Sequence, residues 1–571
     1  MKIPIRFSAF IAACIIVIVS FFLTEGAGSS AVTDQDEVQA YTSNLPFPMP
    51  NVQVARFPDR IVNITNFGAV GDGHTLNTDA FARAFQACAQ AGGGRVLVPA
   101  GIWLTGPVQL KSNIDLHLER GALILSSPRF EDYPMVRTTY EGSRSVRAMS
   151  PIYGVKLENI AITGEGIIDG SGDAWRPVKK NKMTDAQWRK LIASGGAVDR
   201  QGNTWYPSVE AMNGPEFIRK LEQGSGPIPP EKYAGARQHL RPVMVSLIEC
   251  KKVLLDGPTF QNSPAWNIHP LMCEDLVIRN ITVLNPWYSQ NGDGLDLESC
   301  RGVVVYKCSF DVGDDAICIK SGKDEAGRKR GRPCENIVIA DCVVYHGHGG
   351  FTVGSEMSGG VRNISVRRCT FLGTDVGLRF KTTRGRGGVV EKIYISDIRM
   401  KDIPTDAIGF NMYYGGEAPI PDSDSKSVLV SRAPAPVDEK TPRFQSIFLK
   451  NIVCTGAERA VLLEGLPEMA IRDIELENVL ISSRKGLECI DADQIRLKNV
   501  RILPRTGPVL SLEDSRNVTM EKVSGPEGVE LFVKLEGERT GGIRILETDL
   551  SKAKKGIELG KNVPADAVIK P

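Results

Sequence analysis

The chain carries almost no net charge, because its 69 Lys and Arg residues nearly balance its 67 Asp and Glu residues, giving a formal total of +2. A balanced chain has no general attraction to nucleic acid or to an anionic membrane surface. We therefore expect no nucleic-acid partner. Any charged partner must be recognised by local groups.

Long hydrophobic runs are scarce. One run, residues 7–23, follows Lys2 and Arg6 and precedes the small residues 26–31. This order is typical of an export signal. We expect residues 1–30 to be a signal peptide that is removed, leaving a secreted or periplasmic protein without stable membrane association. An uncleaved anchor is the alternative, because the run is close to the shortest length that spans a bilayer.

Cysteine pairs at the spacing of a zinc site or a redox motif are absent, although the chain has 12 cysteines. Cys308, Cys342 and Cys369 occupy one position of the repeat described next, where other copies have Ile or Val. This pattern indicates small core side chains. Without Cys14 the cysteine count is odd, so at least one thiol of a monomer is unpaired.

An internal repeat runs through most of the chain. Its eight-residue pattern is apolar, any, apolar, two mostly polar positions, then Ile, Val or Cys, any and apolar. The alternation predicts a strand, and the polar pair, often with Asn or Asp, predicts a bend that accepts left-handed backbone. The copies begin at Val155, Leu276, Val303, Ile337, Ile364, Ile393, Ile447, Ile474, Ile495 and Val518.

A second strand follows in each unit, as in DGLDLES, DAICIKS, GGFTVGS and VGLRFKT, and most units are separated by about 21 to 34 residues. This period suits one turn of a solenoid. The connections are too short and too rich in Gly and Asn for a doubly wound α/β fold. The sequence therefore predicts an all-β protein, a single right-handed parallel β-helix.

The domain prediction has three parts. Residues 1–30 are the signal peptide, residues 31–52 an N-terminal linker, and residues 53–571 the β-helix domain. Near its start, Asn77 or Thr78 can cap a helix with Phe81, Phe85 and Cys88 on one face, which can cover the open end of the solenoid. Insertions interrupt the repeat at about 173–241 and 415–443, and insertions in solenoids often collect on the binding face.

Four clusters of polar residues follow one another at matching phase of the repeat. Stacked strands lie about 4.8 Å apart, so residues of equal phase in adjacent turns are neighbours. This alignment puts Asp293 beside Asp315, and Gly292, Asp314, His348 and Asp375 in the next column. The clusters are Asn291-Gly-Asp293, Gly313-Asp314-Asp315, Gly347-His348-Gly349 and Arg379-Phe-Lys381.

Three close aspartates suit hydrolysis of a glycosidic bond. One carboxyl, its pKa raised by like-charged neighbours, can protonate the leaving oxygen while the others activate water. Clustered aspartates can also bind calcium, but Arg379, Lys381 and His348 would repel a metal and attract an anionic sugar such as a uronic acid. We expect no metal and no cofactor.

These motifs, in this order and spacing, resemble those of the polygalacturonases, glycoside hydrolase family 28. The segments NFGAVGDG, VLVPAG and LTGPVQLKSN resemble the start of the same family. The resemblance covers roughly Gln53 to the end of the β-helix. It implies a right-handed parallel β-helix that hydrolyses its substrate with inversion and without a cofactor.

The resemblance also implies roles for individual residues. Asp314 corresponds to the general acid, and Asp293 with Asp315 to the pair that activates water. His348 supports the acid. Arg379 and Lys381 hold the leaving-side galacturonate on this reading, and His269 with Trp266 lines the glycone side. Asn291 and either Tyr413 or Tyr414 complete the substrate-binding residues. The chain departs from the family at Gly292, where Thr is common.

The predicted function is cleavage of α-1,4-galacturonosyl linkages in galacturonan by an exported, monomeric enzyme. The insertion at 173–241 could wall off one end of the cleft, which favours removal of single residues from chain ends. The alternatives are a hydrolase of galacturonate–rhamnose linkages, a calcium-dependent pectate lyase, and a non-catalytic β-helix adhesin that binds glycans.

Overall fold

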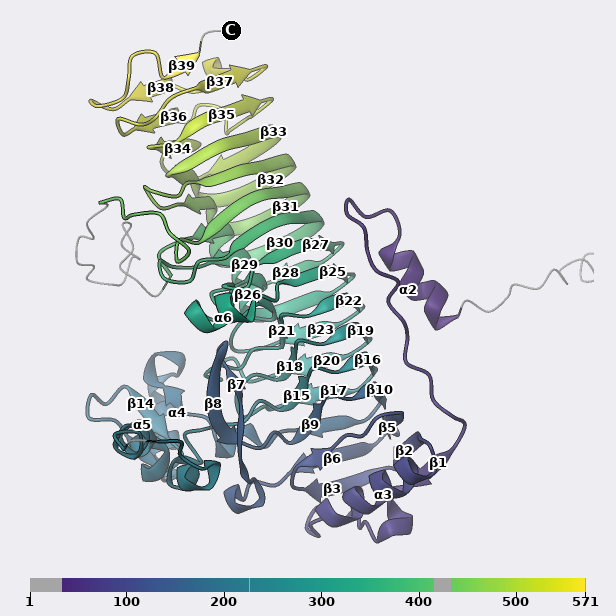
Figure 1. Ribbon diagram of the computed structural model, residues 1–571. Helices are drawn as coiled ribbons and strands as arrows, with labels where there is room; N and C mark the ends of the chain where they lie inside the picture. The colour runs from purple at the N-terminus through teal and green to yellow at the C-terminus, as the bar shows by residue number, and fades with distance from the viewer. Residues whose placement is uncertain (1–32, 225, 415–432, 570–571) are drawn as a thin grey trace, which may run out of the picture.

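The protein is a right-handed parallel β-helix, as predicted (Figure 1). The computed structural model describes residues 33–569 except residue 225 and residues 415–432. The predicted signal peptide and most of the second insertion lie outside the described residues. Within the described ranges, no helix is long and apolar enough to cross a bilayer.

One stack of parallel strands carries the predicted site and is named the site sheet here. Each of its strands pairs with the matching strand of the next turn, for example Leu295 with Ile317. In chain order its strands are β4 (Val108–Gln109), β9 (Ile152–Val155), β15 (Val245–Ile248), β18 (Ile268–Leu271), β21 (Leu295–Glu298), β24 (Ile317–Lys320), the end of β26 (Val343–Val353), and β29 (Thr374–Lys381).

Two further stacks complete each turn. The first contains β2 (Gly94–Val98), β5 (Ile114–Leu118), β10 (Glu158–Gly164), β16 (Lys251–Asp256), β19 (Glu274–Arg279), β22 (Arg301–Tyr306), β25 (Cys334–Ala340) and β27 (Val361–Arg367). The second contains β3 (Gly101–Thr105), β6 (Ala122–Ser126), β11 (Ile167–Asp169), β17 (Thr259–Gln261), β20 (Thr282–Leu284), β23 (Ser309–Asp311) and β28 (Thr370–Leu372).

The later turns are more regular. Single long strands run around the whole turn in β30 (Val389–Asn411), β31 (Arg443–Glu464) and β32 (Ile471–Ile490). The last strands are β33 (Ala492–Pro504), β34 (Leu510–Glu513), β35 (Arg516–Glu521), β36 (Leu531–Glu536), β37 (Ile543–Leu546), β38 (Lys555–Leu559) and β39 (Val568–Ile569).

The polar pair of the repeat forms the predicted bend. Asn280, Asn451 and Asn478 have φ between 54° and 56°, a region that Asn tolerates better than most residues. The amides also bond along the stack, since Asn478 Nδ2 donates to Asn451 Oδ1 at 3.2 Å.

The copy predicted to begin at Val155 is out of phase. Ile160 aligns with Val253, which in turn aligns with Leu276, the first position of a true copy. The pattern at Val155 places Ile160 at its sixth position. Each turn has two bends at which Asn can adopt a left-handed backbone. Asn159, with φ 58°, occupies the bend before the strand, whereas the pattern assigned it to the bend after the strand.

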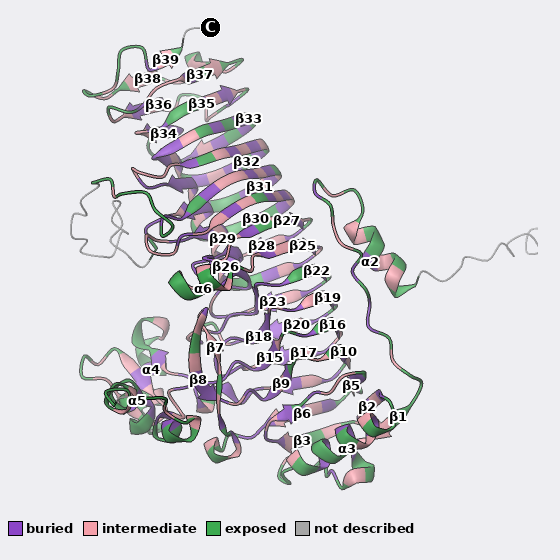
Figure 2. Ribbon diagram, in the orientation of Figure 1, coloured by how far each residue is buried: buried purple, intermediate pink, exposed green. Residues whose placement is uncertain are grey.

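The interior is a continuous column of mostly aliphatic side chains. Figure 2 colours the buried residues purple along the stacked strands. Each buried Ile, Leu or Val contributes roughly 1.5–3 kcal/mol through removal from water. All 11 cysteines of the described part are free and buried, which confirms that Cys308, Cys342 and Cys369 are core side chains.

The first turn is covered by helix α3 (Thr78–Gln90), whose Phe81, Phe85 and Cys88 are buried. This confirms the capping helix, with one difference. Asn77 occupies the N-cap position, but its side chain bonds the backbone of Val70 instead of a helix amide.

Residues 31–52 are not a free linker. They contain helix α2 (Asp34–Thr42), which packs along the side of the β-helix (Figure 1). Val38 is buried there with Val277 and Val304, and the Tyr41 ring stacks on Tyr306 with centroids 4.2 Å apart. The single buried residue of so short a helix gave no clear periodic signal.

The first insertion forms a small lobe between β11 and β15. It contains α4 (Asp185–Ala193), α5 (Val209–Leu221) and a three-stranded sheet of β12 (Val178–Lys179), β14 (Thr204–Tyr206) and β13 (Ala197–Val198). Thr184 and Gln187 form a capping box at the start of α4. Next to the lobe stands a hairpin that the sequence analysis missed, β7 (Met135–Tyr140) and β8 (Ser143–Ala148).

Candidate active site

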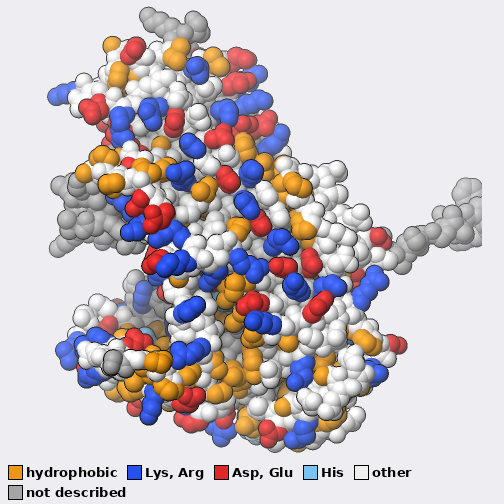
Figure 3. Space-filling model, in the orientation of Figure 1, with side chains coloured by type: hydrophobic (Ala, Val, Ile, Leu, Met, Phe, Trp, Pro, Cys, Tyr) orange, Lys and Arg blue, Asp and Glu red, His pale blue; other side chains and the backbone are white. Residues whose placement is uncertain are grey.

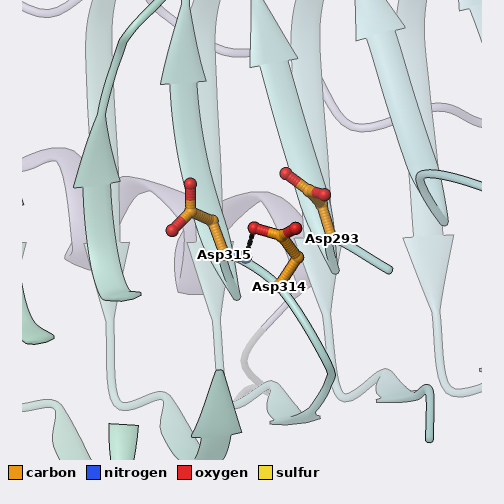
Figure 4. Close-up of side chains that lie close together, drawn as sticks. All are labelled: Asp293, Asp314 and Asp315. Atoms are coloured by element: carbon orange, nitrogen blue, oxygen red, sulfur yellow. Dashed lines mark hydrogen bonds between the residues drawn. The ribbon is translucent and has the colours of Figure 1, made fainter. Parts of the chain in front are cut away.

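The three predicted aspartates meet at the start of two neighbouring strands of the site sheet. Asp293 precedes β21, while Asp314 and Asp315 precede β24. Since Leu295 pairs with Ile317, the aspartates two residues earlier are neighbours. One oxygen from each carboxyl lies within 4.8 Å of the others, and Figure 4 shows the three side chains next to one another at the start of two neighbouring strands.

Asp315 is the most buried member, with 1% of its side chain exposed. Its Oδ1 lies 3.0 Å from Arg379 NH1 and its Oδ2 lies 2.7 Å from Lys381 Nζ. Burial raises the pKa of this carboxyl, but the charges of Lys381 and Arg379 outweigh burial and hold the pKa far below its usual value. Asp315 is therefore ionised.

Asp314 is more open, with 17% of its side chain exposed. Its Oδ1 accepts a bond from the backbone N–H of Asp315 at 3.0 Å, drawn in Figure 4, and lies 3.1 Å from His348 Nδ1. Burial raises the pKa of Asp314, but the hydrogen bond from His348 brings the pKa below the usual value.

The raised pKa belongs to Asp293. Burial is the main cause, and the neighbouring charges of Asp296 and Asp314 add to it. Its Oδ1 is buried and accepts no hydrogen bond from the described residues. In the free protein the extra proton of the cluster thus lies on Asp293, whereas the sequence analysis expected it on Asp314.

Arg379, Lys381 and Tyr414 form the cationic side of the site. The Tyr414 ring lies 4.7 Å from Lys381 Nζ and 5.5 Å from the Arg379 guanidinium carbon. Tyr414 is 39% exposed, whereas Tyr413 is 5% exposed and lies beside Arg384. Of the two tyrosines that the sequence left open, Tyr414 is the one at the cluster.

Two predicted binding residues bond to the protein itself. His269 is 1% exposed, and its Nε2 lies 2.9 Å from Glu298 Oε2. Asn291 Oδ1 accepts a bond from Arg241 NH2 at 2.9 Å. The structure brings Asn291 to the cluster but encloses His269 beneath Trp266 and the hairpin, so His269 offers no open face for a substrate.

Gly292 replaces the common Thr of the family motif, and the structure shows what occupies the space. A Cβ on Gly292 would lie 1.9 Å from Ser289 Oγ. Ser289 is buried, and its hydroxyl has no hydrogen-bond partner among the described residues. The turn before Asp293 is therefore packed by Ser289.

A buried ionic group beneath the cluster was missed. Lys320 Nζ lies 3.5 Å from Asp296 Oδ1, 3.0 Å from Glu356 Oε2 and 4.6 Å from the Trp266 ring. Burial raises the pKa of Asp296 to about 8. The alternation of DGLDLES puts Asp296 on the outer face of the site sheet, but burial of that face depends on remote segments.

The hairpin β7–β8 is the remote segment that covers this face. Tyr140 stacks against Trp266 with centroids 4.8 Å apart. At the hairpin tip, Gly142 O accepts a 3.4 Å bond from the N–H of Lys323, which follows β24. The hairpin thus crosses the earlier turns of the site sheet, as Figure 1 shows beside β9, β15 and β18.

The insertion lobe reaches the cluster from the same side. Lys182 Nζ lies 3.0 Å from His348 Nε2. Lys and Arg side chains gather around the hollow between this lobe and the turns above it (Figure 3). The site therefore has one covered end, toward the earlier turns, and one more open end at Arg379 and Tyr414.

Among the described residues, the three aspartates form a group whose ligand atoms lie close enough together to hold a metal ion. Both oxygens of Asp315 already face cations, Arg379 and Lys381. A metal would have to displace these two charges, so the donor set fits an anionic substrate better than a cation.

A parallel β-helix with carboxyls clustered where neighbouring strands begin is the framework of a glycoside hydrolase. The family model described as "Glycosyl hydrolases family 28" matches residues 229–432. The crystal structure of an exopolygalacturonase from Thermotoga maritima is similar, with 34% identity, a TM-score of 0.65, and coverage of 79% of this chain and 93% of that chain. The chain belongs to glycoside hydrolase family 28.

Two other proteins extend the comparison. The chain is 28% identical over 421 residues to an exo-poly-alpha-D-galacturonosidase of Dickeya chrysanthemi, covering 71% of this chain and 64% of that protein. The family 28 exopolygalacturonase of Yersinia enterocolitica is 22% identical, with a TM-score of 0.57 and coverage of 89% and 79%. The latter shares the fold.

Proposed function

We propose that this protein hydrolyses α-1,4-galacturonosyl linkages of galacturonan and removes residues from chain ends. The proposal follows the exo-acting relatives from Thermotoga and Dickeya. The observation that carries it is the contrast between the two ends of the site. On β18 and β21, His269, Asp296 and Glu298 are at most 1% exposed, whereas Tyr414 on the later side is 39% exposed.

The covered end lies on the glycone side of the aspartates. A cleft that is closed just beyond one sugar admits only the end of a chain. The leaving portion of the polymer would then extend over Arg379 and Tyr414 toward the open end. This supports release of single residues from the non-reducing end.

In the proposed mechanism, Asp314 protonates the leaving oxygen, because it is the most exposed of the three carboxyls. Asp293 and Asp315 activate the water. The proton that rests on Asp293 in the free protein must reach Asp314 when substrate binds, and the three carboxyls titrate as one coupled group. His348 holds Asp314 through the bond to Oδ1.

Arg379 and Lys381 link binding to catalysis. Arg can hold a carboxylate through two parallel bonds, and Lys adds a point charge. In the free protein both cations neutralise Asp315. When the galacturonate carboxylate takes over these contacts, Asp315 loses stabilisation of its charged form and becomes a stronger base for water. The mechanism needs no cofactor.

Export, domain division and oligomeric state are proposals as well. We propose a monomeric β-helix enzyme that is exported by residues 1–30, with the insertion lobe and the hairpin as parts of the binding site. A hydrolase that cuts galacturonate–rhamnose linkages is the second candidate, and the pair Arg379 and Lys381 at the leaving side favours galacturonate over rhamnose there.

The test is product analysis of residues 32–571 on polygalacturonate and on rhamnogalacturonan oligosaccharides. Saturated monogalacturonate from the first substrate, lost in Asp314→Asn, is the expected result. A ladder of oligomers would contradict end-directed cleavage, and release only from the second substrate would establish the other specificity. An unsaturated product that disappears with a chelator would identify a lyase instead.

Stereochemistry provides a separate check. Inverting enzymes usually separate their carboxyls by about 6.5–9.5 Å, while oxygens of this cluster approach within 4.8 Å. We still expect inversion, because Asp293 and Asp315 can hold the attacking water between them while Asp314 protonates the leaving oxygen. Proton NMR of the first-formed anomer measures this directly, and a retained configuration would refute it.

A further inference from the structure

We propose that Lys182, which the insertion lobe contributes, is a positioning residue that sets the tautomer of His348 and thereby supports Asp314. This inference rests on the proposed function for its kinetic arm only. In this role the insertion lobe orients His348, in addition to covering one end of the cleft.

The position of Lys182 is fixed by packing. It ends the 3₁₀ turn Lys180–Lys182, directly after β12. The next residue, Met183, packs with the buried group Val178, Trp188 and Trp205. Tyr288, from the β-helix loop that leads to Asp293, packs on the same group. The lobe is thus anchored to the loop before the catalytic turn.

The contact to His348 is the observation that assigns the role. Lys182 Nζ lies 3.0 Å from His348 Nε2, while Lys179 and Lys180 of the same basic run are exposed. No carboxylate of a described residue lies within 4.0 Å of Lys182 Nζ to compete for the ammonium. The ammonium therefore faces the imidazole.

An ammonium group has only donors, so His348 Nε2 must accept the bond. A neutral imidazole that accepts at Nε2 carries its proton at Nδ1. Nδ1 lies 3.1 Å from Asp314 Oδ1, where this proton is donated. Lys182, His348 and Asp314 thus form one directed chain of hydrogen bonds.

A competing group lies close by. Asp375 Oδ2 is 3.7 Å from the same Nε2 and would favour a proton at that nitrogen. Without Lys182, Asp375 would draw the proton to Nε2. Nδ1 would then point a lone pair at Asp314, whose Oδ1 would keep only the backbone N–H of Asp315 as a donor. Lys182 Nζ lies 3.0 Å from His348 Nε2 and Asp375 Oδ2 lies 3.7 Å from it, so the closer Lys182 determines the tautomer.

The first measurement is ¹⁵N NMR of the histidine ring in the full protein, with the His348 signals assigned through His348→Gln. The wild-type protein should show the Nδ1–H tautomer, and Lys182→Met should move His348 toward the Nε2–H tautomer. Lys180→Met, in the same turn, should leave the spectrum unchanged. An unchanged His348 signal in Lys182→Met would overturn the proposal.

The second measurement is kinetic. Lys182→Met should lower kcat about tenfold with KM within twofold, because the variant weakens support of the acid but not binding. Lys182→Arg, which keeps a donor, should retain most of kcat. A raised KM with unchanged kcat would mean that Lys182 binds substrate directly, which contradicts the inference. If galacturonan is not hydrolysed at all, the proposed function fails while the NMR arm still decides the role of Lys182.

Discussion

Asp293, Asp314 and Asp315 have the same side chain but different surroundings. Two cations keep Asp315 ionised, His348 stabilises the charge of Asp314, and burial leaves Asp293 protonated. The sequence could place the three together because their positions follow from the repeat. It could not tell which of them holds the proton, because that depends on side chains from other turns.

Asp296 provides a test of these electrostatics. Its pKa is raised to about 8, mainly by burial, so between about pH 4 and pH 8 the folded state holds a proton that the unfolded state has lost. Stability contributed by this residue therefore falls as pH rises through that window. Asp296→Asn mimics the protonated form and removes the dependence.

The expected result is that the wild-type protein loses on the order of 1 kcal/mol per pH unit relative to Asp296→Asn between about pH 5 and pH 8. Denaturant unfolding at several pH values measures it. Parallel curves for wild type and Asp296→Asn would contradict the assignment.

Tyr414 supplies a second residue-scale prediction. Its ring lies beside both Lys381 and Arg379, and such contacts contribute about 0.5–2 kcal/mol. Tyr414→Ala should therefore lower kcat/KM for galacturonan about tenfold. Tyr413→Phe, at a buried position, should have less than a twofold effect. The reverse ranking in steady-state kinetics would favour Tyr413 as the site tyrosine.

At the scale of elements, helix α2 shows how a short helix without an apolar face can be held by one side chain of the β-helix. Arg279 projects from β19 and lies 2.8 Å from Asp34, 3.2 Å from Glu37 and 2.8 Å from Asp256. It is 6% exposed. One buried guanidinium thus joins the helix to two turns of the β-helix.

Arg279→Met should release α2 while the β-helix stays folded. Loss of bonds to charged groups costs about 1–3 kcal/mol, so amide exchange of residues 33–57 should become about 10–100-fold faster, as local opening predicts. Hydrogen–deuterium exchange measures this. Arg301→Met, at a half-exposed position of the next turn, should change exchange little. Equal protection in both variants would contradict the role of Arg279.

For the whole molecule, the hairpin β7–β8 decides which end of the cleft is open. Its tip requires Gly142, where φ is +72° and an added Cβ would lie 2.5 Å from Lys323 N. Gly142→Val should push the tip away from the loop after β24. Galacturonan could then extend past Trp266, and oligomers should appear among the products.

Gly202→Val is the matched control, because Gly202 has φ +71° but no atom within 4 Å of an added Cβ. It imposes the same backbone strain in the lobe and should leave the products unchanged. Chromatography of early products measures both variants. Monogalacturonate alone from a folded Gly142→Val protein would show that the hairpin does not set end-directed cleavage.

Alternation around the two-residue turn Glu141-Gly142 was the signal that could have revealed this hairpin, because a Gly in such a turn marks two paired strands. Alternation also predicted every strand of the site sheet near the aspartates. The stacked strands share one repeated pattern, so each copy supports the prediction of the others. The hairpin occurs once, and its sequence does not indicate which strands it covers.

The sequence by itself determined the fold and the meeting of Asp293, Asp314, Asp315, Arg379 and Lys381, because the period of a stacked solenoid fixes which residues are neighbours. Only the tertiary structure decided which end of the site is covered, which tyrosine lies beside the cations, and where the cluster holds its proton. Those properties depend on burial by the hairpin and the insertion lobe, which lie outside the repeat, and on charges that several turns of the β-helix bring together.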